Sequence, residues 1–182
     1  MGAKTLLTVE QFERLPEIEG ISYELDQGEL VEVPNASLLH NKIRGKLIQL
    51  LLNHLDSHPG RGTVIAEQWF RLNADSVRAP DVALIGSQQA SLADNDAAIQ
   101  PFCPALAAEV VSPSNTVDEL IHKTQQYLEA GAQTVWILVP RSREIHVYSA
   151  TAHPQILCAD ELLEEPTLLP GFSVPVADLF NV

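Results

Sequence analysis

The feature that most constrains this chain is the run at residues 104–111, which is almost continuously apolar. Such a run suits a strand that is buried on both faces, as in a sheet covered by other elements on each side. Glu109 stands inside it, and burying an unpaired carboxylate is costly or shifts its pKa. Glu109 therefore needs a metal, a basic partner or a proton, unless it lies at the strand end and faces solvent or forms a structural salt bridge.

The periodicity of the remaining residues predicts an α/β fold in which a mixed β-sheet is flanked by helices. Capping boxes at Thr8 and Thr116 mark two helix starts. The predicted elements are a helix at 8–15, a hairpin at 22–25 and 29–33, a helix at 35–55, strands at 63–72, 80–85 and 104–111, a helix at 116–131, and strands at 134–139, 144–149 and 153–158. Residues 87–100 are predicted to form a loop, and residues 169–180 are rich in the proline and glycine residues typical of turns. We expect residues 1–182 to form a single domain.

The charge of the chain limits its partners. It has 24 acidic and 11 basic residues, a net charge of −13. This argues against a general phosphate-binding surface, because nucleic-acid binders usually show a net basic footprint. Two local groups of bases stand out, namely Lys42, Arg44 and Lys46, and then Arg61, Arg71 and Arg78. We expect Lys42 and Lys46 to face outward from the helix at 35–55 and to contact phosphates.

Cysteine usage and hydropathy predict the compartment. Cys103 and Cys158 lie far apart and offer neither a zinc site nor a disulfide framework. No run approaches the roughly 18 apolar residues of a membrane helix. The first residues lack the apolar core of a secretory signal. We therefore expect a cytoplasmic protein with no membrane partner.

Two further residues gain meaning beside Glu109. Asp81 follows Pro80 at the mouth of a short strand, and alone it would be interpreted as a turn cap. Two acids on neighbouring buried strands can share one hard cation, because Mg²⁺ is usually held by one or two carboxylates and water. Lys123 stands at the edge of an apolar helical stripe, from which it can snorkel to water or reach the carboxylates. Beside the carboxylates, the Lys123 ammonium could orient an attacking water or stabilise the negative charge that develops on a phosphoryl group.

Several segments in this order resemble the Uma-two family of predicted restriction endonucleases, which belongs to the PD-(D/E)XK nuclease superfamily. The segments are YELDQGELVEVPNASLLHNKI, RAPDVAL, LAAEVVSPSNTVDELIHKTQQYLEAGAQTVWILV and REIHVY. The resemblance runs from about Thr8 to Phe180. It is strongest from Pro80 and Asp81 through Glu109 to Lys123.

The resemblance implies a restriction-endonuclease-like fold and a Mg²⁺- or Mn²⁺-dependent endodeoxyribonuclease. Asp81, Glu109 and the backbone carbonyl of Val110 would hold the metal, and Lys123 would be catalytic. The superfamily places a lysine two residues after its Glu, where this chain has Val111. The resemblance implies that this lysine has moved to the following helix, as Lys123. Some nucleases of this kind act as dimers, so a homodimer is compatible with it.

Three weaker matches and two rival functions stay open. Glu24 and His40 fall at family positions that imply an accessory role, although each also has a structural interpretation. Glu67 is expected to form a surface ion pair. One rival function is a non-catalytic interaction module on a nuclease-like fold, favoured by the acidic charge and by Val111. The other is a different metal hydrolase that uses the same carboxylates.

Overall fold

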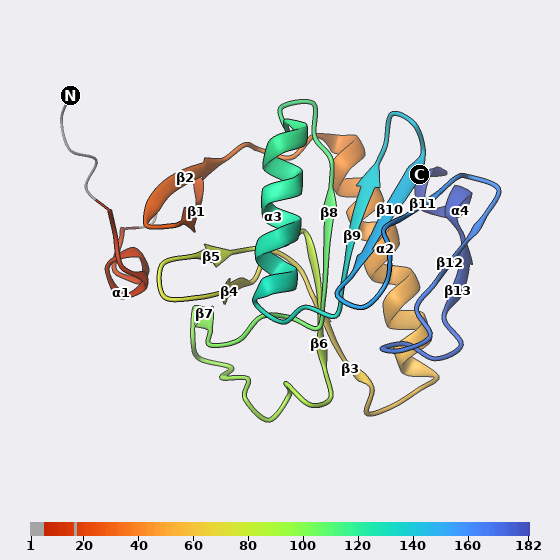
Figure 1. The fold of residues 1–182 in the computed structure, drawn as a ribbon, viewed down its shortest axis with the longest axis horizontal. Helices are drawn as coiled ribbons and strands as arrows, with labels where there is room; N and C mark the ends of the chain where they lie inside the picture. The colour runs from red at the N-terminus through yellow and green to blue at the C-terminus, as the bar shows by residue number, and fades with distance from the viewer. Residues whose placement is uncertain (1–5, 17) are drawn as a thin grey trace.

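The computed structural model describes residues 6–16 and 18–182 (Figure 1). Its helices are α1 (Val9–Glu13), α2 (Leu38–Asp56), α3 (Val117–Glu129) and α4 (Val176–Phe180). Its strands are β1 (Ser22–Asp26), β2 (Glu29–Val33), β3 (Gly62–Ile65), β4 (Trp69–Arg71), β5 (Val77–Arg78), β6 (Val82–Gly86), β7 (Ile99–Gln100), β8 (Leu106–Val110), β9 (Thr134–Val139), β10 (Glu144–Ser149), β11 (Gln155–Leu157), β12 (Leu162–Glu164) and β13 (Ser173–Pro175). No helix in these residues is long and apolar enough to cross a bilayer.

The main sheet is mixed and lies between two helices. Its six strands have the order β11-β10-β9-β8-β6-β3. β8 and β9 run parallel, with α3 as the crossover between them, whereas β6 lies antiparallel to β8. α2 packs on one face of this sheet and α3 on the other (Figure 1). The predicted α/β fold, a mixed sheet flanked by helices, is confirmed.

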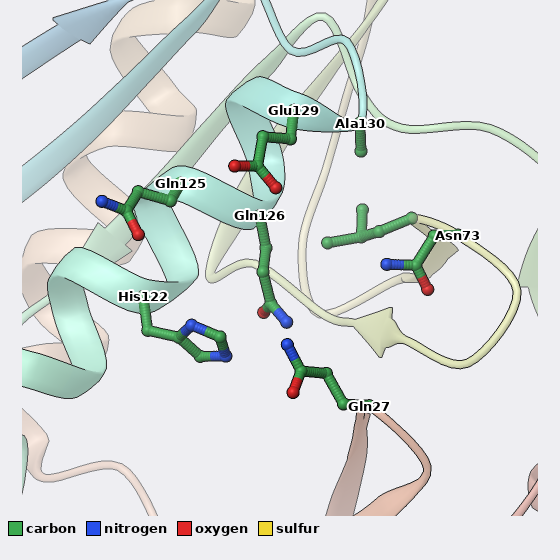
Figure 2. A pocket seen from close by; sticks show the side chains of 8 residues that line it. Gln27, Asn73, His122, Gln125, Gln126, Glu129 and Ala130 are labelled. Carbon is green, nitrogen blue, oxygen red and sulfur yellow. The ribbon is translucent and has the colours of Figure 1, made fainter.

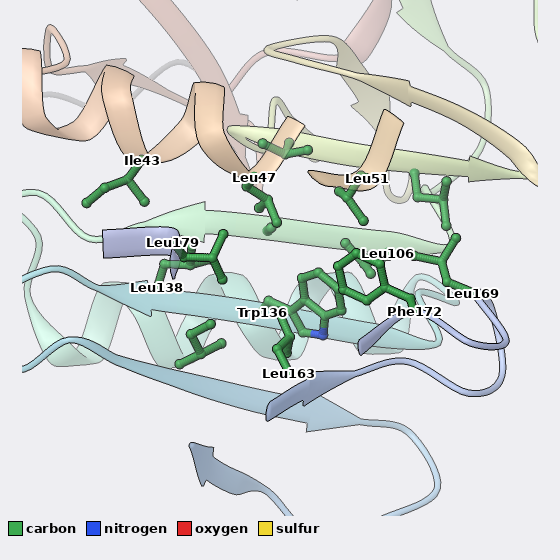
Figure 3. Close-up of a cluster of buried hydrophobic side chains, with 14 of the residues drawn as sticks. Ile43, Leu47, Leu51, Leu106, Trp136, Leu138, Leu163, Leu169, Phe172 and Leu179 are labelled. Atoms are coloured by element: carbon green, nitrogen blue, oxygen red, sulfur yellow. The ribbon is translucent and has the colours of Figure 1, made fainter. Parts of the chain in front are cut away.

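Alternate residues of β8 face the two helices. Leu106 and Val110 join a buried apolar cluster with α2, part of which Figure 3 shows. Ala107 instead joins a second cluster, which contains Tyr127 of α3. Because side chains alternate along a strand, Glu109 shares the face of Ala107. The buried carboxylate therefore lies on the α3 side of the sheet.

A second sheet carries the predicted hairpin. Its strands have the order β2-β1-β5-β4-β7, and β1 pairs with β2 in the register Leu25 to Leu30. α1 covers this sheet by burying Val9 and Phe12 against Leu25. The side chain of Thr8 caps α1, as the sequence predicted. The hairpin brings Glu24 into the interior of the protein, where it is 1% exposed.

The predicted strand at 63–72 is wrong, because this segment divides between the two sheets. β3 pairs with β6 in the main sheet, whereas β4 pairs with β5 and β7 in the second. Glu67 lies between them with a φ of 53°, and its N–H donates to the carbonyl oxygen of Pro80 at 3.2 Å. A non-glycine residue at positive φ turns the chain sharply, and strand periodicity carries no signal of it.

Two other boundaries differ from the prediction. α2 begins at Leu38, later than the predicted residue 35, because Ser37 is its N-cap and accepts a hydrogen bond from the His40 N–H at 3.2 Å. The C-terminal region is more regular than its turn signals indicate. It forms β12, β13 and α4, which bury Leu163 and Leu179 in the α2 cluster. The predicted loop at 87–100 likewise ends in β7.

Candidate active site

Asp81 is fixed at the mouth of β6 by two contacts to one oxygen. Its Oδ2 accepts a hydrogen bond from the Val110 N–H at 2.7 Å and lies 3.1 Å from Nε2 of His40. The Asp81 side chain is 16% exposed and the His40 side chain 9%. Within residues 6–16 and 18–182, Oδ1 of Asp81 has no hydrogen-bond partner. This carboxylate is therefore oriented and keeps one oxygen available for a ligand.

Glu109 is the neighbouring carboxylate, since Ala108 lies opposite Val82 across the two strands. Its Oε1 accepts a hydrogen bond from the Tyr127 hydroxyl at 2.8 Å and lies 3.5 Å from Nζ of Lys123. Burial raises the pKa of Glu109 to about 7, with the Asp81 charge adding to the rise and Lys123 opposing it. Oε2 has no hydrogen-bond partner in the part of the chain that the structure describes.

Lys123 of α3 lies between two carboxylates. Its Nζ is 3.0 Å from Oε2 of Glu24 and 3.5 Å from Oε1 of Glu109. Burial lowers the pKa of Lys123, but the charges of Glu109 and Glu24 outweigh this effect, and the pKa is raised overall. Lys123 is therefore a fixed ammonium at neutral pH. It can donate hydrogen bonds and offset negative charge, but it is not a general base.

Glu24 belongs to a buried polar network behind the lysine. Besides Lys123, it accepts hydrogen bonds from Nη1 of Arg78 at 2.9 Å and from the Ala79 N–H at 3.1 Å. Arg78 is 2% exposed and also contacts Asp26 at 2.8 Å and Gln126 at 2.7 and 2.9 Å. Arg78, one of the local bases noted in the sequence, is therefore not available to a phosphate, because its guanidinium is enclosed by these partners.

Asp81, Glu109, Lys123 and His40 line one pocket of about 270 Å³, called here the carboxylate pocket. Val110 at the end of β8, and Ser112 and Asn115 in the segment that follows it, contribute to its wall. Glu24 does not line this pocket but contacts Lys123 from behind. The structure therefore brings together the three residues predicted to carry the chemistry, and it adds His40 from α2.

The predicted phosphate contacts lie elsewhere. Lys42 is exposed and Lys46 half-buried on α2, and neither lines the carboxylate pocket. Arg44, between them, forms an ion pair with Glu67, so the expected surface pair of Glu67 is confirmed. A separate pocket of about 390 Å³ is lined by Gln27, Asn73, Gln125 and other polar residues of the hairpin and α3 (Figure 2). It contains none of the predicted catalytic residues.

Sequence reasoning gave no specific role to Tyr127 or Arg78, although both support the site. By its spacing Tyr127 belongs to the apolar stripe of its helix, and only its proximity to a buried acid reveals the hydroxyl as a donor. Arg78 precedes Asp81 by three residues in the segment RAPDVAL. The signal that could have found both was Glu109 itself, since a buried carboxylate needs donors close by.

The donor set of the carboxylate pocket fits a hard divalent cation. Asp81 and Glu109 each keep one oxygen without a protein partner, and Mg²⁺ commonly takes one or two carboxylates with water in its other positions. No group of three or more His, Cys, Asp or Glu forms a metal site within residues 6–16 and 18–182. A cation here would therefore depend on water or backbone oxygens. The predicted third ligand, the carbonyl of Val110, belongs to the residue whose N–H donates to Asp81.

The fold defines the class of protein. The mixed sheet between α2 and α3 is a restriction-endonuclease-like fold, and a crystal structure described as "a putative nuclease belonging to DUF820" from Anabaena variabilis ATCC 29413 matches it with a TM-score of 0.84. The match covers 96% of this chain and 97% of that chain at 21% identity, which establishes the fold. Residues 9–177 match the model of the Uma2 (Uma-two) family, described as "Putative restriction endonuclease", and the chain belongs to that family. Comparison with curated proteins finds no match.

Proposed function

We propose that this protein is a metal-dependent endonuclease that hydrolyses phosphodiester bonds of nucleic acid, with DNA as the expected substrate. The observation that carries the proposal is the convergence of Asp81, Glu109 and Lys123, from three separate elements, on one pocket. Membership of the Uma2 family supports it. We further expect a single-domain cytoplasmic protein, for which a homodimer is compatible.

The cation expected in this pocket is Mg²⁺ or Mn²⁺. When bound, it would lower the pKa of a water molecule and place positive charge beside the phosphate. Oδ1 of Asp81 and Oε2 of Glu109 are the oxygens left to hold it, together with the carbonyl of Val110. A pKa of about 7 for Glu109 means that the cation competes with a proton for this carboxylate at neutral pH.

The side chains around these carboxylates have separate tasks. Tyr127 and His40 hold Glu109 and Asp81 in position, each through a single oxygen. Lys123 remains an ammonium and presents N–H donors at the pocket wall. There it would orient the attacking water or stabilise the charge that develops on the phosphate. Glu24 and Arg78 would act by holding Lys123 rather than by touching the substrate.

A second candidate is a non-catalytic interaction module on the same fold. One observation favours it. The cations nearest the pocket are already paired, Lys123 with Glu24, Arg44 with Glu67, and Arg78 with Glu24 and Asp26. Together with the net charge of −13, this limits the attraction of phosphates. A cleavage assay separates the two functions, because the module has no turnover.

The test uses plasmid and oligonucleotide substrates with Mg²⁺ or Mn²⁺. The parent protein and Asp160→Asn, which changes an exposed acid outside the pocket, should cleave at equal rates. Asp81→Asn and Lys123→Met should lose at least about a hundredfold in rate, as when a charge acting in the transition state is removed. If Lys123→Met, shown to be folded, cleaves within a fewfold of the parent rate, the catalytic role of Lys123 fails. If the folded parent cleaves none of these substrates with either metal, the nuclease function fails and the module is favoured.

A further inference from the structure

A larger, mainly apolar pocket adjoins the carboxylate pocket. It has a volume of about 610 Å³ and is lined by residues of α1, of the turn that follows and of β1, among them Phe12, Leu15 and Ile21. The two pockets share Ser22, Tyr23 and Trp69 in their walls. A ligand held at the carboxylates can therefore extend into the apolar pocket past these residues. The proposed phosphodiester chemistry gives no role to this second space.

Trp69 lines both pockets and is the residue best placed to contact a ligand that extends from one into the other. The indole is half-buried, and its Nε1–H donates to the carbonyl oxygen of Tyr23 at 3.1 Å. Phe12 packs edge-on against it, with ring centroids 5.1 Å apart and planes at 65°. Because its only polar atom is engaged, Trp69 offers aromatic surface to the pockets rather than a hydrogen-bond donor. Because both contacts hold the ring in place, a ligand that stacks on it loses little entropy in ordering it.

The charges beside Trp69 indicate which nucleic acid suits this wall. Glu67 is two residues away and lines the carboxylate pocket, and the nearby Arg44 is paired with it. Affinity for duplex DNA depends mainly on neutralising the charge of its phosphates. A cation that is already paired with a carboxylate, as Arg44 is with Glu67, contributes little to this. Binding of single strands draws a larger part of its free energy from bases stacked on aromatic side chains. A base can enter a pocket of this kind only when it is unpaired.

We propose that Trp69 is a stacking platform for an unpaired base next to the phosphate held at Asp81 and Glu109. This inference rests on the proposed nuclease function and names its substrate class, which is nucleic acid with unpaired nucleotides at the cleavage site rather than continuous duplex. Tyr23 and Phe12 support the platform through the hydrogen bond and the edge-on contact.

Intrinsic fluorescence tests the inference without turnover. The chain has two tryptophans, and Trp136 is fully buried in the core, so quenching by a stacked base reports on Trp69. The probes are a short single-stranded oligothymidylate and the same strand in a blunt duplex, with Ca²⁺ in place of Mg²⁺. The single strand should quench the fluorescence saturably and bind more tightly than the duplex.

Substitution at Trp69 provides the control. Trp69→Leu should abolish the quenching and weaken single-strand binding, measured by anisotropy of a labelled strand, by roughly five- to 150-fold, the loss typical of removing one aromatic platform. Trp69→Phe keeps an aromatic ring and should retain most of the affinity, although it lacks the Nε1–H donor. Circular dichroism on both variants shows whether Phe12 and α1 still pack.

An abasic scan locates the stacked base. One abasic position in the single strand should weaken binding to the parent protein, and the same position should have no effect on Trp69→Leu. Equal binding of single strand and duplex, binding of neither, or unchanged affinity in folded Trp69→Leu would overturn the inference. If the protein cleaves duplex DNA and Trp69→Leu cleaves it at the same rate, the nuclease function holds and the stacking role of Trp69 is wrong. Binding that depends on Trp69, with no cleavage, supports the platform and removes the nuclease function.

Discussion

At the scale of single residues, Glu109 has its partners on one oxygen only. Tyr127 and Lys123 both approach Oε1, whereas Oε2 has no hydrogen-bond partner among the described residues. Asp81 is arranged in the same way, with Val110 and His40 on Oδ2. Such one-sided contacts orient a carboxylate without satisfying it. They are the expected preparation for a cation that takes one oxygen from each acid.

The burial of Glu109 changes what the removal of Lys123 should do. The sequence-based prediction for Lys123→Met is that stability changes little, because the variant would leave only solvent-accessible carboxylates. Glu24 and Glu109 are in fact 1% and 8% exposed, so this expectation is corrected. Without metal, we predict that Lys123→Met lowers the free energy of unfolding by about 3–5 kcal/mol, since it leaves buried charge less compensated. Urea denaturation in EDTA measures this loss.

The same experiment in Mn²⁺ gives the control. Excess Mn²⁺ should restore much of the stability of Lys123→Met, because a bound cation replaces the lost charge beside Glu109. Lys42→Met, at an exposed lysine of α2, should change stability little in either condition. Equal stability of Lys123→Met and the parent in EDTA contradicts the structural part of the account.

The hydroxyl of Tyr127 provides a separate residue-scale prediction. Its hydrogen bond stabilises the ionised form of Glu109 and so lowers the pKa of that carboxyl against the rise caused by burial. Tyr127→Phe keeps the ring and removes the donor. The pKa of Glu109 should rise further, and Mn²⁺ affinity, measured by calorimetry across pH, should reach its plateau at a higher pH than in the parent. A coincident pH profile for the two proteins shows that Tyr127 does not act on Glu109.

At the scale of elements, α3 organises the site. Lys123 and Tyr127 lie one turn apart on this helix, on the face that meets Glu109. Gln126, between them in sequence, accepts hydrogen bonds from Arg78 and donates to Asp26, and so ties α3 to the hairpin. The crossover helix from β8 to β9 thus carries both the Lys123 ammonium and the Tyr127 hydroxyl that contact the Glu109 carboxylate. This placement is compatible with the proposal that Lys123 takes the role of the lysine that the superfamily has at the position of Val111.

α2 carries the predicted phosphate contacts, which the structure places outside the carboxylate pocket. Lys42 and Lys46 are spaced one turn apart. Charge reversal of both to Glu should weaken nucleic-acid binding and flatten the dependence of log Kd on log salt, because two phosphate contacts are lost. Fluorescence anisotropy at several salt concentrations measures both quantities. An unchanged affinity together with an unchanged salt slope removes α2 from the interface.

The elements and the site could be predicted to different extents. Capping boxes at Thr8 and Thr116 and strong apolar periodicity identify α1, α3, the hairpin and β8, since these signals are local. The end of β3 and the turn at Glu67 could not be predicted, because a residue at positive φ does not change the alternation of apolar and polar residues. The contacts of Glu24 with Lys123 and Arg78 could not be predicted either, because these partners lie 99 and 54 positions away from Glu24 in the sequence. The convergence of Asp81, Glu109 and Lys123 on one pocket could be predicted, because buried charges in apolar segments are rare and family motifs order them.

At the scale of the whole molecule, the raised pKa of Glu109 predicts a pH dependence of stability without metal. A carboxyl whose folded pKa, about 7, lies above its ordinary value of 4.5 binds a proton more tightly when folded. Its contribution to stability is complete below pH 4.5 and is lost as pH rises through 7. In EDTA, the parent should therefore lose stability relative to Glu109→Gln over this range. A constant difference between the two proteins contradicts the assigned pKa.

The proposed function depends above all on one divalent cation that Asp81 and Glu109 would hold between them. The most direct measurement is a crystal soaked in Mn²⁺ and examined by anomalous diffraction, with Glu109→Gln crystals treated in the same way. We expect one strong peak in the carboxylate pocket, within coordination distance of both carboxylates, that is absent from the variant. A parent crystal with Mn²⁺ bound only at other sites, or a peak that persists in Glu109→Gln, would contradict it.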